Sequence, residues 1–183
     1  MNLTKSLTRV SLGTAALLLV PLVAMQFTAE VNWSPFDFVV MGALLFSAGF
    51  ALELVASRRG TLAYRLAAAG AVLTALLQLW ANLAVGFIGS GPNPANLLCG
   101  VVLVVGLAGA VVARFQPRGM AYAMLATAGL QILVPVLGLL IWHLQIAPQE
   151  WAISGVFAAL WLAAAWLFQR SDVSPTKLHQ QLA

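Results

Sequence analysis

Six stretches of the sequence are each long and apolar enough to cross a lipid bilayer as a helix. Such a helix needs about 20 mostly apolar residues to span a hydrocarbon core of about 30 Å. The spans lie near residues 10–29, 36–57, 61–88, 96–115, 119–143 and 151–169. Runs such as Leu97–Val112 lack the alternation of apolar and polar residues found in membrane β-barrels. The sequence therefore predicts an all-α polytopic membrane protein, a six-transmembrane-helix bundle.

The composition supports this class. Hydrophobic residues make up 62% of the chain and charged residues 8%, whereas an average soluble domain carries about 25% charged residues. A single cysteine, Cys99, excludes an internal disulfide framework. Because the predicted loops are short, we expect one transmembrane domain covering residues 1–183, with residues 170–183 as a polar cytoplasmic tail.

The first span resembles a secretory signal peptide, because Lys5 and Arg9 precede its apolar run. A cleavage site before Glu30, however, would place Phe27 at the −3 position, where small residues are required. We therefore expect an uncleaved first helix.

The positions of the cationic residues predict the orientation. In a six-helix topology, all nine fall on one side: Lys5, Arg9, Arg58, Arg59, Arg65, Arg114, Arg118, Arg170 and Lys177. The opposite side holds the carboxylates of Glu30, Asp37 and Glu150. Since Lys and Arg concentrate in cytoplasmic loops, both termini are predicted to be cytoplasmic. A pI near 10 would suggest nucleic-acid binding in a soluble chain. Here the orientation explains the charge, so the expected partner is the lipid bilayer and not nucleic acid.

The outer loops carry oxygen-bearing side chains that could bind a cation or a polar ligand, since hard cations prefer oxygen ligands. The candidates are Glu30, Asp37, Asn93, Asn96 and Glu150. Helix starting is the alternative interpretation. The second, fourth and sixth helices each have a proline where the first helical residue should be, at Pro35, Pro94 and Pro148, and proline suits that position. Capping of these helices would account for most of the five candidates.

Polar side chains at membrane depth are the default place to look for function. Thr74, Gln78 and Asn82 recur every four residues and so share one helix face. Thr127 and Gln131 recur in the same way on the fifth span, followed by Pro135. The two stripes lie at similar depth, which predicts that the third and fifth helices face each other or line one cavity. The stripes are either interhelical contacts that stabilise the bundle or a pathway for water or a polar substrate.

Glu53 is the only acidic residue in the interior of a predicted span, close to the cytoplasmic end of the second helix. Arg65 lies about one turn into the third helix, across a tight turn. An unpaired charge at this depth would be costly, so we predict a buried Glu53–Arg65 ion pair. A proton or cation gate is the alternative.

The sequence contains none of the residue patterns that commonly support catalysis. It holds no clustered metal ligands, no Ser/His/Asp set within reach in the membrane and no cytoplasmic phosphate-binding glycine loop. His143 and His179 are predicted on opposite sides of the membrane, which excludes their joint ligation of a haem. We therefore expect no enzymatic activity, no cofactor and no bound metal.

Several segments are similar to those of a known group of proteins. They are Glu30-Val-Asn-Trp with Asp37-Phe-Val-Val, Asn82-Leu-Ala-Val-Gly-Phe-Ile-Gly with Asn93-Pro-Ala-Asn-Leu, and Ala113-Arg-Phe-Gln-Pro-Arg-Gly-Met. With these segments the chain resembles a group of small bacterial multi-pass inner-membrane proteins of unknown function. The resemblance implies a bacterial inner-membrane location and a helical fold, and it transfers no functional residue.

Two functions remain open from the sequence. The first is an accessory or structural subunit, or a stabiliser, of a membrane complex, with other membrane subunits or a second copy as partner. The second is a small transporter or channel for an ion or polar solute, which would use the polar stripe between the third and fifth helices. The lack of chemistry and the small size favour the first.

Overall fold

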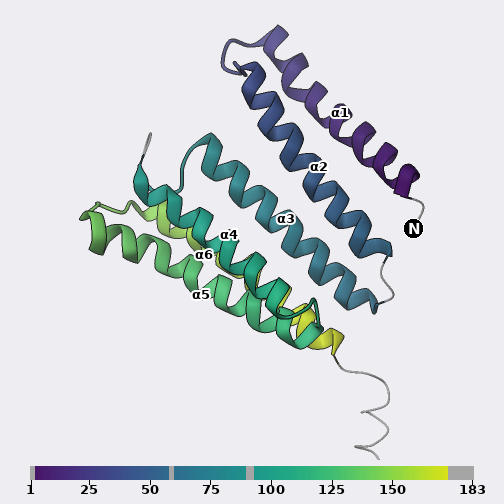
Figure 1. The fold of residues 1–183 in the computed structure, drawn as a ribbon. Helices are drawn as coiled ribbons and strands as arrows, with labels where there is room; N and C mark the ends of the chain where they lie inside the picture. The colour runs from purple at the N-terminus through teal and green to yellow at the C-terminus, as the bar shows by residue number, and fades with distance from the viewer. Residues whose placement is uncertain (1–2, 58–59, 90–92, 173–183) are drawn as a thin grey trace, which may run out of the picture. The chain divides into compact units, whose positions relative to one another are not determined.

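The computed structural model describes residues 3–57, 60–89 and 93–172, and every regular element among them is a helix (Figure 1). The helices are α1 (Leu3–Phe27), α2 (Pro35–Ser57), α3 (Leu62–Ala84), the short 3-10 helix η1 (Pro94–Asn96), α4 (Leu97–Val112), α5 (Pro117–Trp142) and α6 (Pro148–Ser171). Six helical segments of the described chain, with η1 and α4 taken together, are long and apolar enough to cross a membrane. The predicted all-helical class is thus confirmed, and so is the presence of six helices long and apolar enough to span a membrane.

The helix ends differ most from the expected ones in two places. α1 begins at Leu3, seven residues before the predicted start, and Ser6 in this extension donates a hydrogen bond to Glu53 of α2. α3 ends at Ala84 instead of residue 88. The last helix continues to Ser171, and the rest of the predicted tail, residues 173–183, lies outside the described residues, as do Arg58 and Arg59.

The contacts between Cα atoms group the chain into two compact units, Met1–Arg59 and Gly60–Ala183. Each unit has its own packing.

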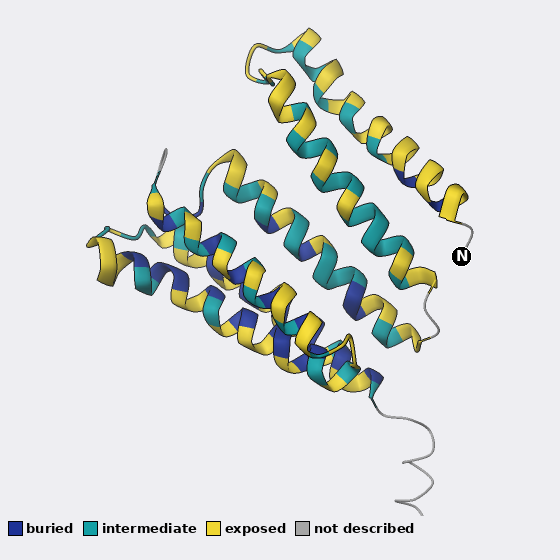
Figure 2. Ribbon diagram, viewed as in Figure 1, coloured by how far each residue is buried: buried dark blue, intermediate teal, exposed yellow. Residues whose placement is uncertain are grey.

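The first unit is a hairpin of two helices, α1 and α2 (Figure 1). Gly49 lets the helices approach closely, since an added Cβ there would lie 3.0 Å from Cγ1 of Val10. α1 buries only Ser6 and Val10, and α2 buries no residue at all (Figure 2). The two helices of the hairpin therefore share almost no buried core with each other.

The second unit contains the buried core. α6 packs extensively against both α5 and α3, while α4 packs against α5. Most buried residues lie on α5 and α6 (Figure 2). Small residues allow the close approach of α4 and α5: a Cβ added at Gly109 would lie only 2.7 Å from Cβ of Ala123. Such small-residue faces are typical of helices packed in membranes.

An irregular segment follows α3 and packs into the same core. Gly86 has a positive φ of +76°, which a glycine adopts without strain, and this conformation lets the chain leave the helix. Phe87 and Ile88 then bury their side chains against Cys99 and Val134. Non-helical backbone in a membrane protein is tolerated where the protein itself buries it.

Two polar contacts tie the other end of the second unit. The Tyr64 hydroxyl donates to the carbonyl oxygen of Phe115 at 2.7 Å, which links α3 to the turn between α4 and α5. Nε of Arg118 lies 2.8 Å from a carboxylate oxygen of Asp172, which links the start of α5 to the end of α6. Both contacts are exposed and hold the ends of helices whose centres carry the core.

Candidate functional site: a buried amide cluster

Three side chains from three helices form a hydrogen-bonded cluster inside the second unit. Nε2 of Gln78, on α3, donates to Oε1 of Gln131, on α5, at 2.8 Å. Nε1 of Trp161, on α6, donates to Oε1 of Gln78 at 2.9 Å. The third and fifth helices were predicted to face each other or to line one cavity, and in the structure a hydrogen bond between these two glutamine side chains joins them.

The cluster is sealed from solvent. Gln78 and Gln131 are 0% exposed and Trp161 is 3% exposed. A buried amide without partners costs about 1–3 kcal/mol, so the two hydrogen bonds offset most of the cost of burying Gln78. None of the three side chains titrates near neutral pH, and the cluster can therefore hold helices or a hydrogen-bonding ligand but cannot transfer protons by itself.

Two buried polar atoms, one in the cluster and one a helical turn away from Gln78 on α3, have no hydrogen-bond partner. They are Nε2 of Gln131 and Oδ1 of Asn82, one donor and one acceptor. Buried polar groups are normally paired, and each exception requires an explanation. Here the unpaired atoms mark positions where a water molecule or a polar ligand would find a free partner.

The two threonines of the stripes do not join the cluster. Thr74 and Thr127 are buried, and each hydroxyl donates at 2.8 Å to a carbonyl of its own helix, those of Gly70 and Ala123 respectively. This contact four residues back is a common way for a helical threonine to satisfy its hydroxyl. α5 continues through Pro135 to Trp142 without interruption.

The remaining stripe residue, Asn82, binds the irregular segment. Its Nδ2 donates to the carbonyl oxygen of Asn96 at 3.2 Å. Oδ1 of Asn96 in turn accepts the backbone N–H groups of Phe87 and Ile88, at 2.8 and 2.9 Å. Asn96 is thus a structural cap for the buried segment and not an available ligand.

The other outer-face candidates also serve backbone groups. Asp37 accepts the backbone N–H and the hydroxyl of Ser34, at 2.7 and 2.8 Å, where α2 begins. Oδ1 of Asn93 accepts the N–H of Ala95 at 3.0 Å, at the start of η1. These contacts agree with the capping interpretation, and Pro35, Pro94 and Pro148 are the first residues of their helices, as expected.

Glu150 joins two segments of the second unit. Its Oε1 accepts the N–H of Gly89 at 2.7 Å, and its Oε2 accepts the N–H of Ala147 at 3.0 Å. Glu30 is exposed in the first unit, where its backbone N–H donates to Thr28. Within residues 3–57, 60–89 and 93–172, no group of three or more His, Cys, Asp or Glu side chains is placed to hold a metal ion.

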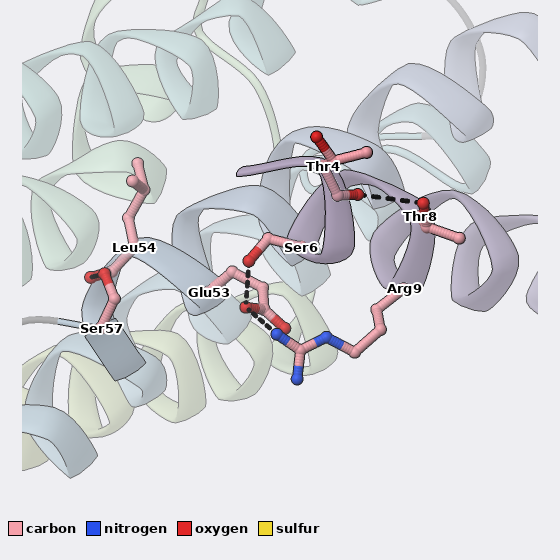
Figure 3. A network of polar contacts seen from close by, with 7 residues as sticks. All are labelled: Thr4, Ser6, Thr8, Arg9, Glu53, Leu54 and Ser57. Carbon is pink, nitrogen blue, oxygen red and sulfur yellow. Dashed lines mark hydrogen bonds and ion pairs between the residues drawn. The ribbon is translucent and has the colours of Figure 1, made fainter. Parts of the chain in front are cut away.

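Glu53 has two partners in the first unit that the sequence analysis did not predict. Its Oε2 accepts the Ser6 hydroxyl at 2.9 Å and a guanidinium N–H of Arg9 at 3.1 Å, both from α1 (Figure 3). These contacts link the first turns of α1 to the last turns of α2, at the end of the hairpin opposite its loop. Arg65 belongs to the second unit, so its pairing with Glu53 stays a prediction.

Sequence reasoning missed Trp161 and Ser6. Trp161 lies near the middle of an apolar span. A buried indole N–H needs a hydrogen-bond acceptor, and this requirement could have indicated a polar partner for Trp161. Ser6 was missed because the first helix was expected to begin after it. In both cases the missing information was which helix lies opposite.

No known protein family matches this chain, and no curated protein and no solved structure is significantly similar to it. The resemblance to small bacterial inner-membrane proteins thus stays a prediction, and the site is interpreted from its own geometry.

Proposed function

We propose that this chain is an integral protein of the bacterial inner membrane that serves as an accessory or structural subunit of a membrane complex. The observation that carries the proposal is the buried contact of Gln78 with Gln131 and Trp161. The most deeply placed polar side chains of α3 and α5 are engaged with each other, as expected of residues that hold helices together.

The first unit supports the same proposal. Its two helices bury only Ser6 and Val10, while long apolar side chains such as Val39 on α2 are exposed. A hairpin whose two helices bury so little against each other leaves most of its apolar surface for contacts outside the pair, and we propose that helices of a partner protein make some of them. The proposed topology has both termini in the cytoplasm, in line with the distribution of the nine cationic residues.

Site-specific photocrosslinking in the native membrane tests the proposal. A photoreactive amino acid at Val39, on α2, should give an adduct with one defined membrane protein or with a second copy of the chain. The same probe at Leu107, which is similarly exposed on α4, is the matched control. Adducts with lipid alone at both positions would contradict the proposed role. Reporter fusions at each terminus check the proposed orientation.

A small transporter or channel for a polar solute is the second candidate. The observation in its favour is the pair of buried, unpaired atoms, Nε2 of Gln131 and Oδ1 of Asn82. Proteoliposome flux measurements on the wild type and on Gln131→Leu distinguish the candidates. A pathway requires solute flux that the substitution abolishes while the fold is retained. A structural role requires no flux and a lower stability of the variant.

A further inference from the structure

An open groove lies between the first turns of α1 and the last turns of α2 (Figure 3). Its volume is about 680 Å³. Two cations, Lys5 and Arg9, and one carboxylate, Glu53, line it together with the hydroxyl-bearing residues Thr4, Thr8 and Ser57. The groove thus has room for a ligand of many atoms and offers charges of both signs.

The carboxylate of Glu53 has one oxygen to spare. Both of its contacts, from Ser6 and from Arg9, reach Oε2. Among the residues that the structure describes, none donates to Oε1, and the side chain is 24% exposed. A carboxylate that is held in a fixed position and has one oxygen without a donor is suited to accept hydrogen bonds from the N–H groups of a cationic ligand.

The cations of the groove also keep free donors. Arg9 uses one guanidinium nitrogen for Glu53, and its side chain is 68% exposed. A guanidinium has five N–H donors, so most remain available for an anion. Lys5 is exposed, one turn before Arg9 on the same helix. Phosphate oxygens are the acceptors that such a pair of cations recognises well.

An apolar slot extends from the groove along the seam of the two helices. Its volume is about 290 Å³, and Val10, Gly49 and Leu52 line it beyond Arg9 and Glu53. The slot includes Gly49, where an added Cβ would lie 3.0 Å from Cγ1 of Val10. A ligand that fills both spaces needs a charged head and an apolar chain.

We propose that the groove binds a phospholipid whose headgroup is phosphoethanolamine. The phosphodiester would accept hydrogen bonds from Lys5 and Arg9, the primary ammonium would donate to Oε1 of Glu53, and an acyl chain would follow the apolar slot. The proposed topology places the groove at the cytoplasmic boundary, at the level of the headgroups. Trimethylated headgroups cannot donate to the carboxylate, and glycerol headgroups carry no ammonium to pair with it.

Native mass spectrometry of the full-length protein released from nanodiscs tests this assignment. The nanodiscs contain equal amounts of phosphatidylethanolamine, phosphatidylcholine and phosphatidylglycerol with identical acyl chains. We expect the wild type to retain phosphatidylethanolamine about three- to tenfold over the other two, the effect of one partly exposed, charge-assisted hydrogen bond. Equal retention of the three lipids, or a preference for phosphatidylglycerol, would overturn the proposal.

Two substitutions separate the parts of the site. Glu53→Gln keeps the shape of the side chain and removes its charge, so it should abolish the preference over phosphatidylcholine. Lys5→Gln should weaken retention of all three lipids and leave the preference in place. Glu30→Gln removes the same charge from the exposed loop between α1 and α2 and serves as the control. An unchanged preference in Glu53→Gln, with the variant folded as judged by circular dichroism, rules out the proposed role of Oε1.

A water-soluble ligand is distinguished by competition. Glycerophosphoethanolamine carries the same headgroup without acyl chains, and we expect it not to displace the retained lipid. Displacement by this compound would mean that the site binds a soluble phosphate ester, which contradicts the assignment to a membrane lipid.

Discussion

Gln78 and Gln131 are 53 residues apart in the sequence, yet their side-chain amides are joined by a 2.8 Å hydrogen bond in the core of the second unit. The bond connects α3 to α5, two helices that are held next to each other by α6. Trp161 of α6 completes the cluster by donating to the same Gln78 side chain. The free energy of unfolding of the second unit should therefore depend on these three residues, and most on Gln78, which takes part in both hydrogen bonds.

Replacing each glutamine in turn should show that Gln78 contributes more to the stability than Gln131. Gln131→Leu removes one hydrogen bond, but it also removes the unpaired Nε2, so we expect a loss of about 0.5–2 kcal/mol in the free energy of unfolding. Gln78→Leu removes two hydrogen bonds and should cost about 1 kcal/mol more. Unfolding in mixed detergent micelles measures both. Equal losses would show that the Trp161 contact contributes nothing.

Trp161→Phe tests the indole contact separately. The substitution keeps an aromatic ring in the core but leaves Oε1 of Gln78 without its donor, so the free energy of unfolding should fall by about 1–3 kcal/mol. Trp166→Phe is the matched control on the same helix, because that side chain is half-exposed. The control should change the thermal midpoint in detergent little, and a loss as large as that of Trp161→Phe would contradict the structure.

Gly109 should tolerate no side chain. A Cβ at this position would lie 2.7 Å from Cβ and 3.3 Å from Cα of Ala123, so Gly109→Ala must push α4 away from α5. We expect a destabilisation of about 1–3 kcal/mol, as for other overpacked cores. Gly129→Ala on α5 is the control, because nothing lies within 4 Å of an added Cβ there. By helix propensity it should be neutral or stabilising.

Asn96 should be needed for its oxygen and not for its amide nitrogen. Asn96→Ala frees the two backbone N–H groups of Phe87 and Ile88 and should destabilise the segment by about 1–3 kcal/mol. Asn96→Asp keeps an acceptor in place and should retain most of the stability. Hydrogen exchange at Phe87 and Ile88 is the local measurement, with faster exchange expected in the alanine variant alone.

The spacing of the polar residues located much of the cluster in advance. A repeat of four residues places Gln78 with Thr74 on one helix face, and the depth of Gln131 matches that of Gln78, so their meeting could be expected. The roles of the threonines could not, because a hydroxyl can donate to its own helix as easily as to a neighbour. The structure shows that both threonines use their own helices.

The contacts of Glu53 show a second limit of prediction from sequence, the choice of an ion-pair partner. Arg65 is nearer in the sequence, but within the first unit Arg9 and Ser6 contact the carboxylate. A charged group near a helix end can pair with any neighbour that the packing brings within reach, and sequence distance does not rank these neighbours.

The sequence alone determined the properties that each segment carries by itself. Span length and apolar composition predicted six helices, and the prolines at positions 35, 94 and 148 marked three helix starts, because these features act through local backbone geometry and transfer to lipid. Tertiary structure alone decided which side chains pair. Trp161 with Gln78, Asn96 with the turn after α3, and Arg9 with Glu53 are contacts between segments. They depend on which helix faces lie against each other, a property that no single segment encodes.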